Sequence, residues 1–351
     1  MDLMCNFLMM KHWISTVVVF GLTLMGLTAE VKVVSGVGTL NMSGGEGPGK
    51  GKHIVLLAGD EEYRSEEAMP LLGKILAEQH GFETTVLFSA DEDGTINPKA
   101  TGSLMGAEAL VKADALIMSL RFRNWNDSTM EKFKAAVNRG IPLIAMRTST
   151  HIFNFKKDSP WAEWSWNHES GGFGRKVLGE TWISHWGVHK KEATLTVVEP
   201  ANSKHPILNG VSPIFGDTDV YEVTLPEDAT ILHRGLVLKG MNRTDALADY
   251  EKKLKRTGVM QKVNDPAMAV VWTREVKNEA GTTNKVLTTT MGAASELVDE
   301  NLRRLIVNGV YWGCGMNVPD KASVAVPENF KPSPYSFNAF KQNMKAADFL
   351  K

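Results

Sequence analysis

The stretch His53-Ile-Val-Leu-Leu-Ala-Gly-Asp-Glu-Glu-Tyr-Arg64 contains an apolar run followed at once by an acidic segment. The apolar run indicates a short strand buried on both faces, and the acidic segment indicates a loop after it. Apolar runs of this kind alternate with segments of helical period as far as Met146. The alternation predicts an α/β fold, a mostly parallel sheet with helices on both faces.

Glycines and a capping pattern mark the ends of the expected helices. Gly81 and Gly140 each close a helix, and Ser128 with Glu131 forms a capping box at the start of the second of these. Strands are expected at 53–58, 82–88, 115–120 and 141–146, with helices at 66–80, 104–112 and 129–139 between them. After a Trp-rich insertion, strands are expected at 193–198, 230–232, 269–272 and 286–290, and an amphipathic helix at 299–312.

The composition is that of a globular protein with a core of its own. The chain has 351 residues, of which 43% are hydrophobic and 23% are charged. This length suits two domains, or one α/β domain with long insertions. The 39 basic and 40 acidic side chains nearly cancel, so no net field attracts nucleic acid or anionic lipid. We therefore expect a small, roughly neutral molecule as the partner.

The N-terminal 29 residues have the pattern of a secretory signal peptide. Lys11 and His12 precede an apolar run at 13–27, which is shorter than the roughly 20 residues that a spanning helix needs. We expect cleavage near Ala29, export to the periplasm or the exterior, and no stable membrane insertion afterwards. An uncleaved membrane anchor is the alternative.

The rest of the chain divides into three segments. Residues 30–52 are rich in Gly and Ser and predict a flexible linker, 53–319 form the folded domain, and 320–351 form a C-terminal arm over the surface. Of the two cysteines, Cys5 belongs to the signal peptide. Cys314 stands alone after a helical pattern, and we expect it to be packed and inert.

Polar residues directly follow three of the predicted strands. Asp60 and Glu61 follow the first strand, Arg123 and Trp125 the third, and Arg147 the fourth. Each segment alone is typical of an ordinary solvated loop. In open parallel sheets, however, ligands bind beyond the carboxyl ends of the strands, so the three loops together predict a cleft at that edge.

A cluster of tryptophans follows the fourth strand. One interpretation is a local hydrophobic core under the insertion, and the other is a wall on which the apolar faces of a sugar stack. Both roles are compatible within one cluster. The tryptophans are Trp161, Trp164, Trp166, Trp182 and Trp186.

Histidines lie among these tryptophans. His185 and His189 are four residues apart, which places their side chains on one face of a helix or on one side of a strand. With His151 and an acidic residue from the first loop they would assemble a divalent metal site, for which zinc is the candidate. Structural, hydrogen-bonded histidines are the alternative.

Signatures of nucleophilic and phosphate chemistry are absent from the sequence. It has no Gly-x-Ser-x-Gly elbow and no phosphate-binding Gly-rich loop after the first strand. Acid/base chemistry, metal-assisted chemistry or plain binding remain.

Several segments together resemble the ThuA-like (trehalose-utilisation) proteins, over about His53 to Pro319. The resemblance implies a flavodoxin-like fold, similar to class I glutamine amidotransferases, and a role in sugar metabolism. Where those amidotransferases carry a nucleophilic cysteine this chain has Arg147, which excludes glutamine hydrolysis through a thioester. The segments are Leu143–Phe153, Gly172–His189, His205–Gly210, Asp219–Tyr221, Val271–Arg274 and Asn308–Trp312.

The resemblance makes His151, His185 and Asp219 candidate catalytic residues. Arg147 is added because it directly follows the fourth strand, where it would anchor a substrate oxygen. The leading hypothesis that the resemblance implies is an exported enzyme, or a degenerate enzyme, that acts on a trehalose-type or oxidised sugar by acid/base or metal-assisted chemistry. A hydrolase or an isomerase is the candidate class. A non-catalytic carbohydrate-binding protein and a structural surface protein are the alternatives. The candidate substrate-binding residues are Asp60, Glu61, Arg123, Trp125 and Trp186, and the candidate metal ligands are His185 and His189.

Overall fold

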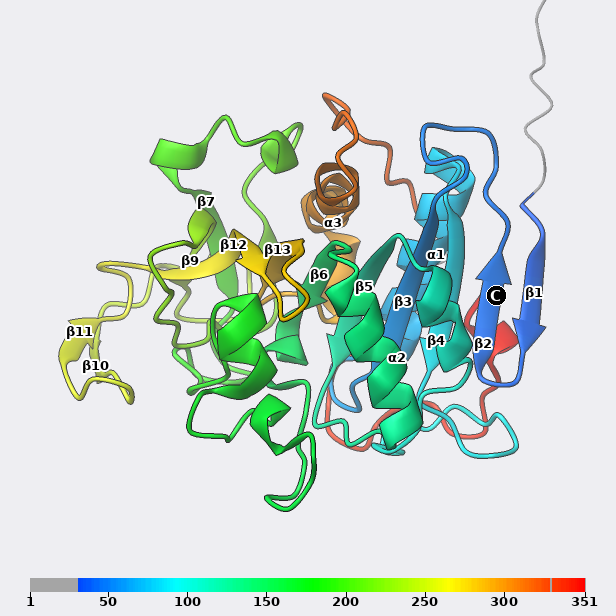
Figure 1. Ribbon diagram of the computed structural model, residues 1–351. Helices are drawn as coiled ribbons and strands as arrows, with labels where there is room; N and C mark the ends of the chain where they lie inside the picture. Colours follow the sequence, from blue (N-terminus) through cyan, green and yellow to red (C-terminus); the bar gives the residue numbers. More distant parts are fainter. Residues whose placement is uncertain (1–30, 329, 351) are drawn as a thin grey trace, which may run out of the picture.

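The centre of the fold is a five-stranded parallel sheet in the order β4-β3-β5-β6-β13 (Figure 1). In chain order these are the second, first, third, fourth and fifth parallel strands, which is the flavodoxin-like order. The predicted fold class is therefore confirmed. The five strands are Glu83–Phe88, His53–Gly59, Ala115–Leu120, Leu143–Met146 and Thr283–Thr289. The computed structural model describes residues 31–328 and 330–350, so the expected signal peptide lies outside the described residues.

Antiparallel strands extend this sheet on both sides to eleven strands, so the sheet as a whole is mixed. Beyond β13 lie β12 (Met268–Lys277), β9 (Thr230–Val237), β7 (Thr194–Val198) and β8 (Phe215–Gly216). Beyond β4 lie β2 (Thr39–Met42) and β1 (Val33–Gly36). A separate hairpin of β10 (Glu251–Lys253) and β11 (Met260–Lys262) protrudes from the side of the molecule (Figure 1).

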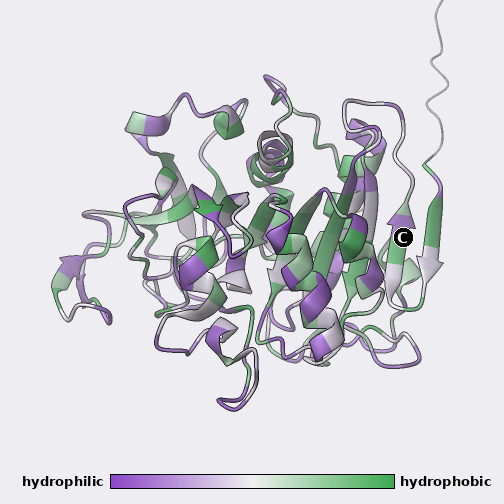
Figure 2. Cartoon of the chain, in the orientation of Figure 1, coloured by the Kyte–Doolittle hydropathy of each residue, from purple (hydrophilic) through white to green (hydrophobic). Residues whose placement is uncertain are grey.

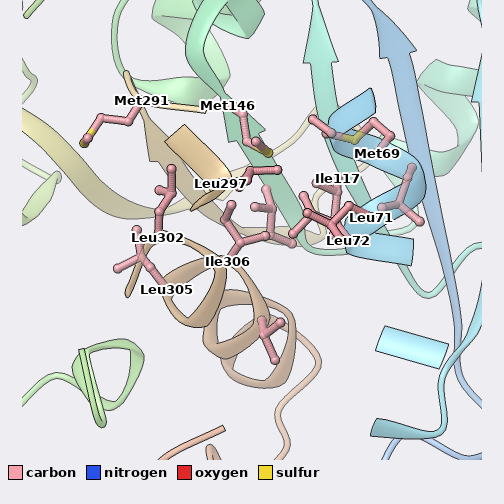
Figure 3. Packing of buried hydrophobic residues seen from close by; sticks show 14 of the residues in the cluster. Met69, Leu71, Leu72, Ile117, Met146, Met291, Leu297, Leu302, Leu305 and Ile306 are labelled. Carbon is pink, nitrogen blue, oxygen red and sulfur yellow. The ribbon is translucent and has the colours of Figure 1, made fainter. Parts of the chain in front are cut away.

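Helices cover both faces of the parallel sheet because successive strand residues point to opposite sides. In β3, Ile54 and Leu56 face the cluster formed with α1 (Ser65–His80) and α3 (Glu300–Gly313). Val55 and Leu57 face the other cluster, with η1 (Ala107–Lys112) and α2 (Asp127–Asn138). Figure 3 shows Leu302, Leu305 and Ile306 of α3 against Met146 and Ile117 of the sheet. Apolar residues concentrate in the strands, and hydrophilic residues in the protruding loops (Figure 2).

The helix ends confirm one of the expected signals and correct another. Gly81 ends α1 in the left-handed region at φ 77°, where its N–H donates to the carbonyl of Ala77 and the N–H of Phe82 donates to that of Leu76. The N-cap of α2 is Asn126 rather than Ser128, because the Asn126 side chain accepts the N–H of Thr129. Within the described residues, none of the helices has the length and apolarity needed to cross a membrane.

The prediction of a flexible linker at 30–52 is wrong. Its residues form β1 and β2, and Leu40 and Met42 are buried against α1. The glycines allow close packing here instead of mobility, since a Cβ on Gly44 would lie 2.2 Å from the carbonyl oxygen of Gly81. Composition alone does not distinguish these two uses of glycine.

Between β6 and β7 the chain forms short helical turns and loops, which hold the Trp-rich insertion. These are η2 (Arg147–His151), η3 (Ala162–Trp164) and η4 (Gly174–Leu178). Other single turns are η5 (Pro200–Asn202), η6 (Pro206–Leu208), η7 (Ala294–Val298) and η8 (Ala346–Leu350).

Candidate functional site

The candidate site lies where β3, β5 and β6 end. Arg147 comes directly after β6 in a left-handed conformation, at φ 43°. Its guanidinium donates to the carbonyls of Asp219 and Thr290 at 2.7 Å each and lies 4.0 Å from the centre of the Tyr221 ring. Because the side chain is completely buried and hydrogen-bonded, Arg147 holds the loop of Asp219 in place and does not reach a substrate.

Arg147 also forms a fully buried salt bridge with the Asp219 carboxylate, at 3.0 Å. Burial alone would raise the pKa of Asp219. The charge of Arg147 and the hydrogen bonds from His185 and His189 overcome that effect and hold the pKa below its usual range. Asp219 is therefore an anion at the base of the site.

Asp219 brings the two predicted histidines together. Its Oδ2 lies 2.8 Å from His185 Nδ1, its Oδ1 lies 3.0 Å from His189 Nδ1, and the two imidazole rings are 4.8 Å apart. The segment is neither a helix nor a continuous strand. His185 pairs with Tyr221 as an isolated bridge, and the chain bends at Trp186 and Gly187 before it reaches His189.

Glu62 from the loop after β3 completes this cluster. Its Oε1 lies 3.1 Å from His189 Nε2, although the two are not aligned as a hydrogen bond, and its side chain is 4% exposed. The hydrogen bond to Asp219 and the neighbouring Glu62 carboxylate raise the pKa of His189 to about 9. One atom from each of His185, His189 and Asp219 lies within 4.8 Å of the others, a spacing that suits a metal ion.

His151 lies beside this centre in an aromatic surround. Burial, and after it the charges of Arg121 and Arg147, lower the pKa of His151 well below its ordinary value, so its ring is neutral at neutral pH. Its Nδ1 is 3.1 Å from the Thr150 hydroxyl, and its ring is 5.7 Å from that of Trp182.

Half-buried aromatic rings lead away from the histidines. Trp182 lies 5.6 Å from His185 and 6.0 Å from Trp166, and Trp166 lies 5.6 Å from Phe122. These three rings are partly accessible to solvent, whereas Trp161 and Trp186 of the tryptophan cluster are buried.

Three of the predicted substrate-binding residues are buried in the structure, and that prediction is wrong for them. Trp125 packs edge-on against Phe133 and is 2% exposed. Trp186 is fully buried, with its indole N–H bonded to the carbonyl of Val263. Arg123 is also buried and donates to the Ser89 hydroxyl and the Pro98 carbonyl. All three stabilise the surrounding loops.

The two acidic residues predicted for substrate binding differ in burial. Asp60 is fully buried and accepts the N–H groups of Glu62 and Tyr63, at 2.7 and 2.9 Å, so it shapes the loop after β3. Glu61 is partly exposed and pairs with Arg121 at 2.9 Å. Only Glu61 can reach a ligand.

Sequence reasoning missed Glu62, Arg121 and the role of Trp182. Glu62 and Arg121 lie in the loops that the strand-end rule singled out, and that rule would have found them. Tyr335, whose ring lies 5.9 Å from His189, comes from the C-terminal arm, where the sequence gives no signal.

No family model matches the chain, and no curated protein matches it. Among solved structures, a protein described as ThuA-like from Parabacteroides merdae aligns with a TM-score of 0.49 and 14% identity, over 82% of this chain and 98% of its own. A second such protein, from Bacteroides uniformis, gives 0.45 and 14%, over 76% and 92%. The glutaminase domain of Trypanosoma brucei CTPS gives 0.32 and 10%, over 78% and 98%.

These neighbours carry the family name and the amidotransferase-like fold that the sequence resemblance implies. At such identities and TM-scores they say nothing about activity. The fold assignment rests on the strand order of the chain itself.

Proposed function

We propose that the chain is an exported enzyme of carbohydrate utilisation that acts on a small saccharide, of the trehalose type or an oxidised derivative. The observation that carries the proposal is the centre formed by His185, His189 and Asp219, with partly accessible aromatic rings beside it. We propose metal-assisted chemistry at this centre, with a divalent cation such as zinc.

The donor set suits such a cation. Two imidazoles and one carboxylate are a common ligand set of catalytic metal sites, which keep further positions open for water or substrate. Metal-binding histidines usually donate their second ring N–H to a carboxylate, and the Glu62 carboxylate lies 3.1 Å from His189 Nε2. The His185 side chain is 39% exposed, so the centre is accessible from solvent. A cation held here would polarise a substrate oxygen.

The surroundings favour a sugar over a charged metabolite. Trp182 and Trp166 offer ring faces for stacking, and Glu61 and Arg121 offer hydrogen-bonding groups that neutralise one another. Glutamine hydrolysis has no support, because Arg147 occupies the turn after β6 and burial raises the pKa of Cys314 to about 11.

The test is saccharide turnover by the purified protein. We expect conversion of a trehalose-type or oxidised sugar that is lost in the His185→Ala/His189→Ala double variant. It should be retained in the matched control His168→Ala, whose Nδ1 hydrogen-bonds Ser170 and which does not belong to the His185, His189 and Asp219 group. Binding without conversion would contradict the enzyme and favour a carbohydrate-binding protein. A protein that neither binds nor converts the sugar would favour a structural surface protein.

A further inference from the structure

The C-terminal arm places an exposed aromatic ring next to the candidate site. Phe337 is 47% exposed, and its ring centre lies 4.8 Å from the guanidinium carbon of Arg121. The same carbon lies 4.9 Å from the ring of Phe122. Phe337 therefore extends the line of rings that runs from Trp182 through Trp166 to Phe122. We call these four residues the aromatic row.

The arm is fixed here by contacts made just before Phe337. The ring of Tyr335 stacks on Tyr63 at 5.1 Å, and its hydroxyl donates to the carbonyl of Asp217 at 2.9 Å. The N–H of Ser336 donates to the carbonyl of Glu62, and Arg64 donates to the carbonyl of Ser336. The arm thus holds the loop after β3 that carries Glu62, and Phe337 is presented at a defined place.

Arg121 connects the arm to the centre. Its guanidinium pairs with Glu61 at 2.9 Å and with Glu62 at 3.1 Å, and Glu62 lies against His189. Since two carboxylates and two rings hold this guanidinium, its position is set before any ligand arrives. The planar Arg121 cation and the partly exposed Glu61 carboxylate lie beside the half-buried Phe122 ring and the exposed Phe337 ring. Such a surface matches the alternating hydroxyls and apolar faces of a sugar.

Phe337 is exposed, and Phe122, Trp166 and Trp182 are half-buried, so the row presents continuous apolar surface of the kind that marks a binding site. One end of the aromatic row, Trp182, adjoins the histidine centre, and the other end, Phe337, lies beyond Arg121. A single sugar ring on Trp182 would leave Phe337 exposed.

We propose that Phe337 and Phe122 form a second sugar subsite, so that the substrate is a saccharide of at least two rings. The first ring lies on Trp182 and Trp166 beside His185. The second lies on Phe122 and Phe337, donates hydroxyl hydrogen bonds to the Glu61 carboxylate and accepts hydrogen bonds from Arg121. This inference rests on the proposed function, and it assigns the C-terminal arm to substrate specificity.

The test compares a disaccharide, trehalose, with glucose as the single ring, by titration of tryptophan fluorescence on the full mature chain. We expect Phe337→Ala to weaken trehalose about tenfold more than glucose, which corresponds to about 1.4 kcal/mol. Phe337→Trp keeps a ring at the position and should restore trehalose binding. Thermal melting of each variant should match the parent, because the side chain is exposed.

Two results would overturn the inference, and they are distinct from failure of the proposed function. If the parent binds both sugars and Phe337→Ala weakens them equally or not at all, the second subsite is wrong while the saccharide proposal stands. If the parent binds neither sugar, the proposed function is contradicted and the subsite falls with it.

Discussion

The carboxylate of Asp219 and the guanidinium of Arg147 meet at 3.0 Å with no exposure of either side chain. A buried pair of this kind is costly to break from one side, because the remaining charge has no partner. Here the pair also orients the carboxylate toward both histidines. The stability of the loop and the geometry of the centre therefore depend on the same contact.

Arg147→Met is expected to lower the free energy of unfolding by about 3–5 kcal/mol, since it leaves the buried Asp219 carboxylate without its buried guanidinium partner. Urea denaturation measures the loss. In the double variant Arg147→Met/Asp219→Asn the unpaired charge is gone, so part of the loss should be recovered. Additive losses from the two substitutions would argue against the coupling.

Trp182 and Trp186 should respond differently to truncation. Trp186→Ala removes a fully buried indole and should cost about 3–5 kcal/mol of stability. Trp182→Ala removes a half-buried ring and should cost clearly less stability while weakening saccharide binding. Melting curves and ligand titrations on both variants decide this, and equal losses of stability would place Trp182 in the core.

Glu66 should make stability depend on pH. Burial raises the pKa of Glu66 from 4.5 to about 8, with Arg64, Glu67 and Asp60 as its charged neighbours. The folded state keeps a proton that the unfolded chain releases, so stability is full below about pH 4.5 and falls as pH rises to about 8, by up to about 1.4 kcal/mol per pH unit. Glu66→Gln should flatten this part of the profile. A profile that is the same in both proteins would show that Glu66 is ionised when folded.

Export is expected to remove the N-terminal residues. We expect N-terminal sequencing of the protein recovered from the periplasm or medium to begin near Glu30. An intact Met1 chain in the membrane fraction would indicate an anchored protein instead.

The sequence predicts the central sheet well because its signal is local. Apolar runs such as 53–58 and 115–120 need only burial on both faces to become parallel strands, and they do. The hydrophobic pattern does not predict that the glycine-rich segment at 30–52 forms β1 and β2. Those strands depend on the close approach of Gly44 to Gly81, at the end of α1.

The side-chain directions at the site were beyond sequence reasoning. Because Arg147 and the loop of Glu62 each follow a parallel strand, the sequence predicts that they lie at one edge of the sheet. The direction of each tryptophan side chain depends instead on the local turn. The chain leaves the extended conformation at His185, where the N–H groups of Trp186 and Gly187 both bond the carbonyl of Val220. That turn directs Trp186 into the core and leaves Trp182 beside the histidines.

Metal content tests the central claim most directly. After dialysis against zinc and then against metal-free buffer, elemental analysis of the purified protein should find about one zinc per chain, in keeping with a three-residue catalytic-type site. The His168→Ala control should match it, and His185→Ala/His189→Ala should hold none while remaining folded. A parent protein without bound metal, or a double variant that retains as much as the parent, would contradict a metal centre at His185, His189 and Asp219.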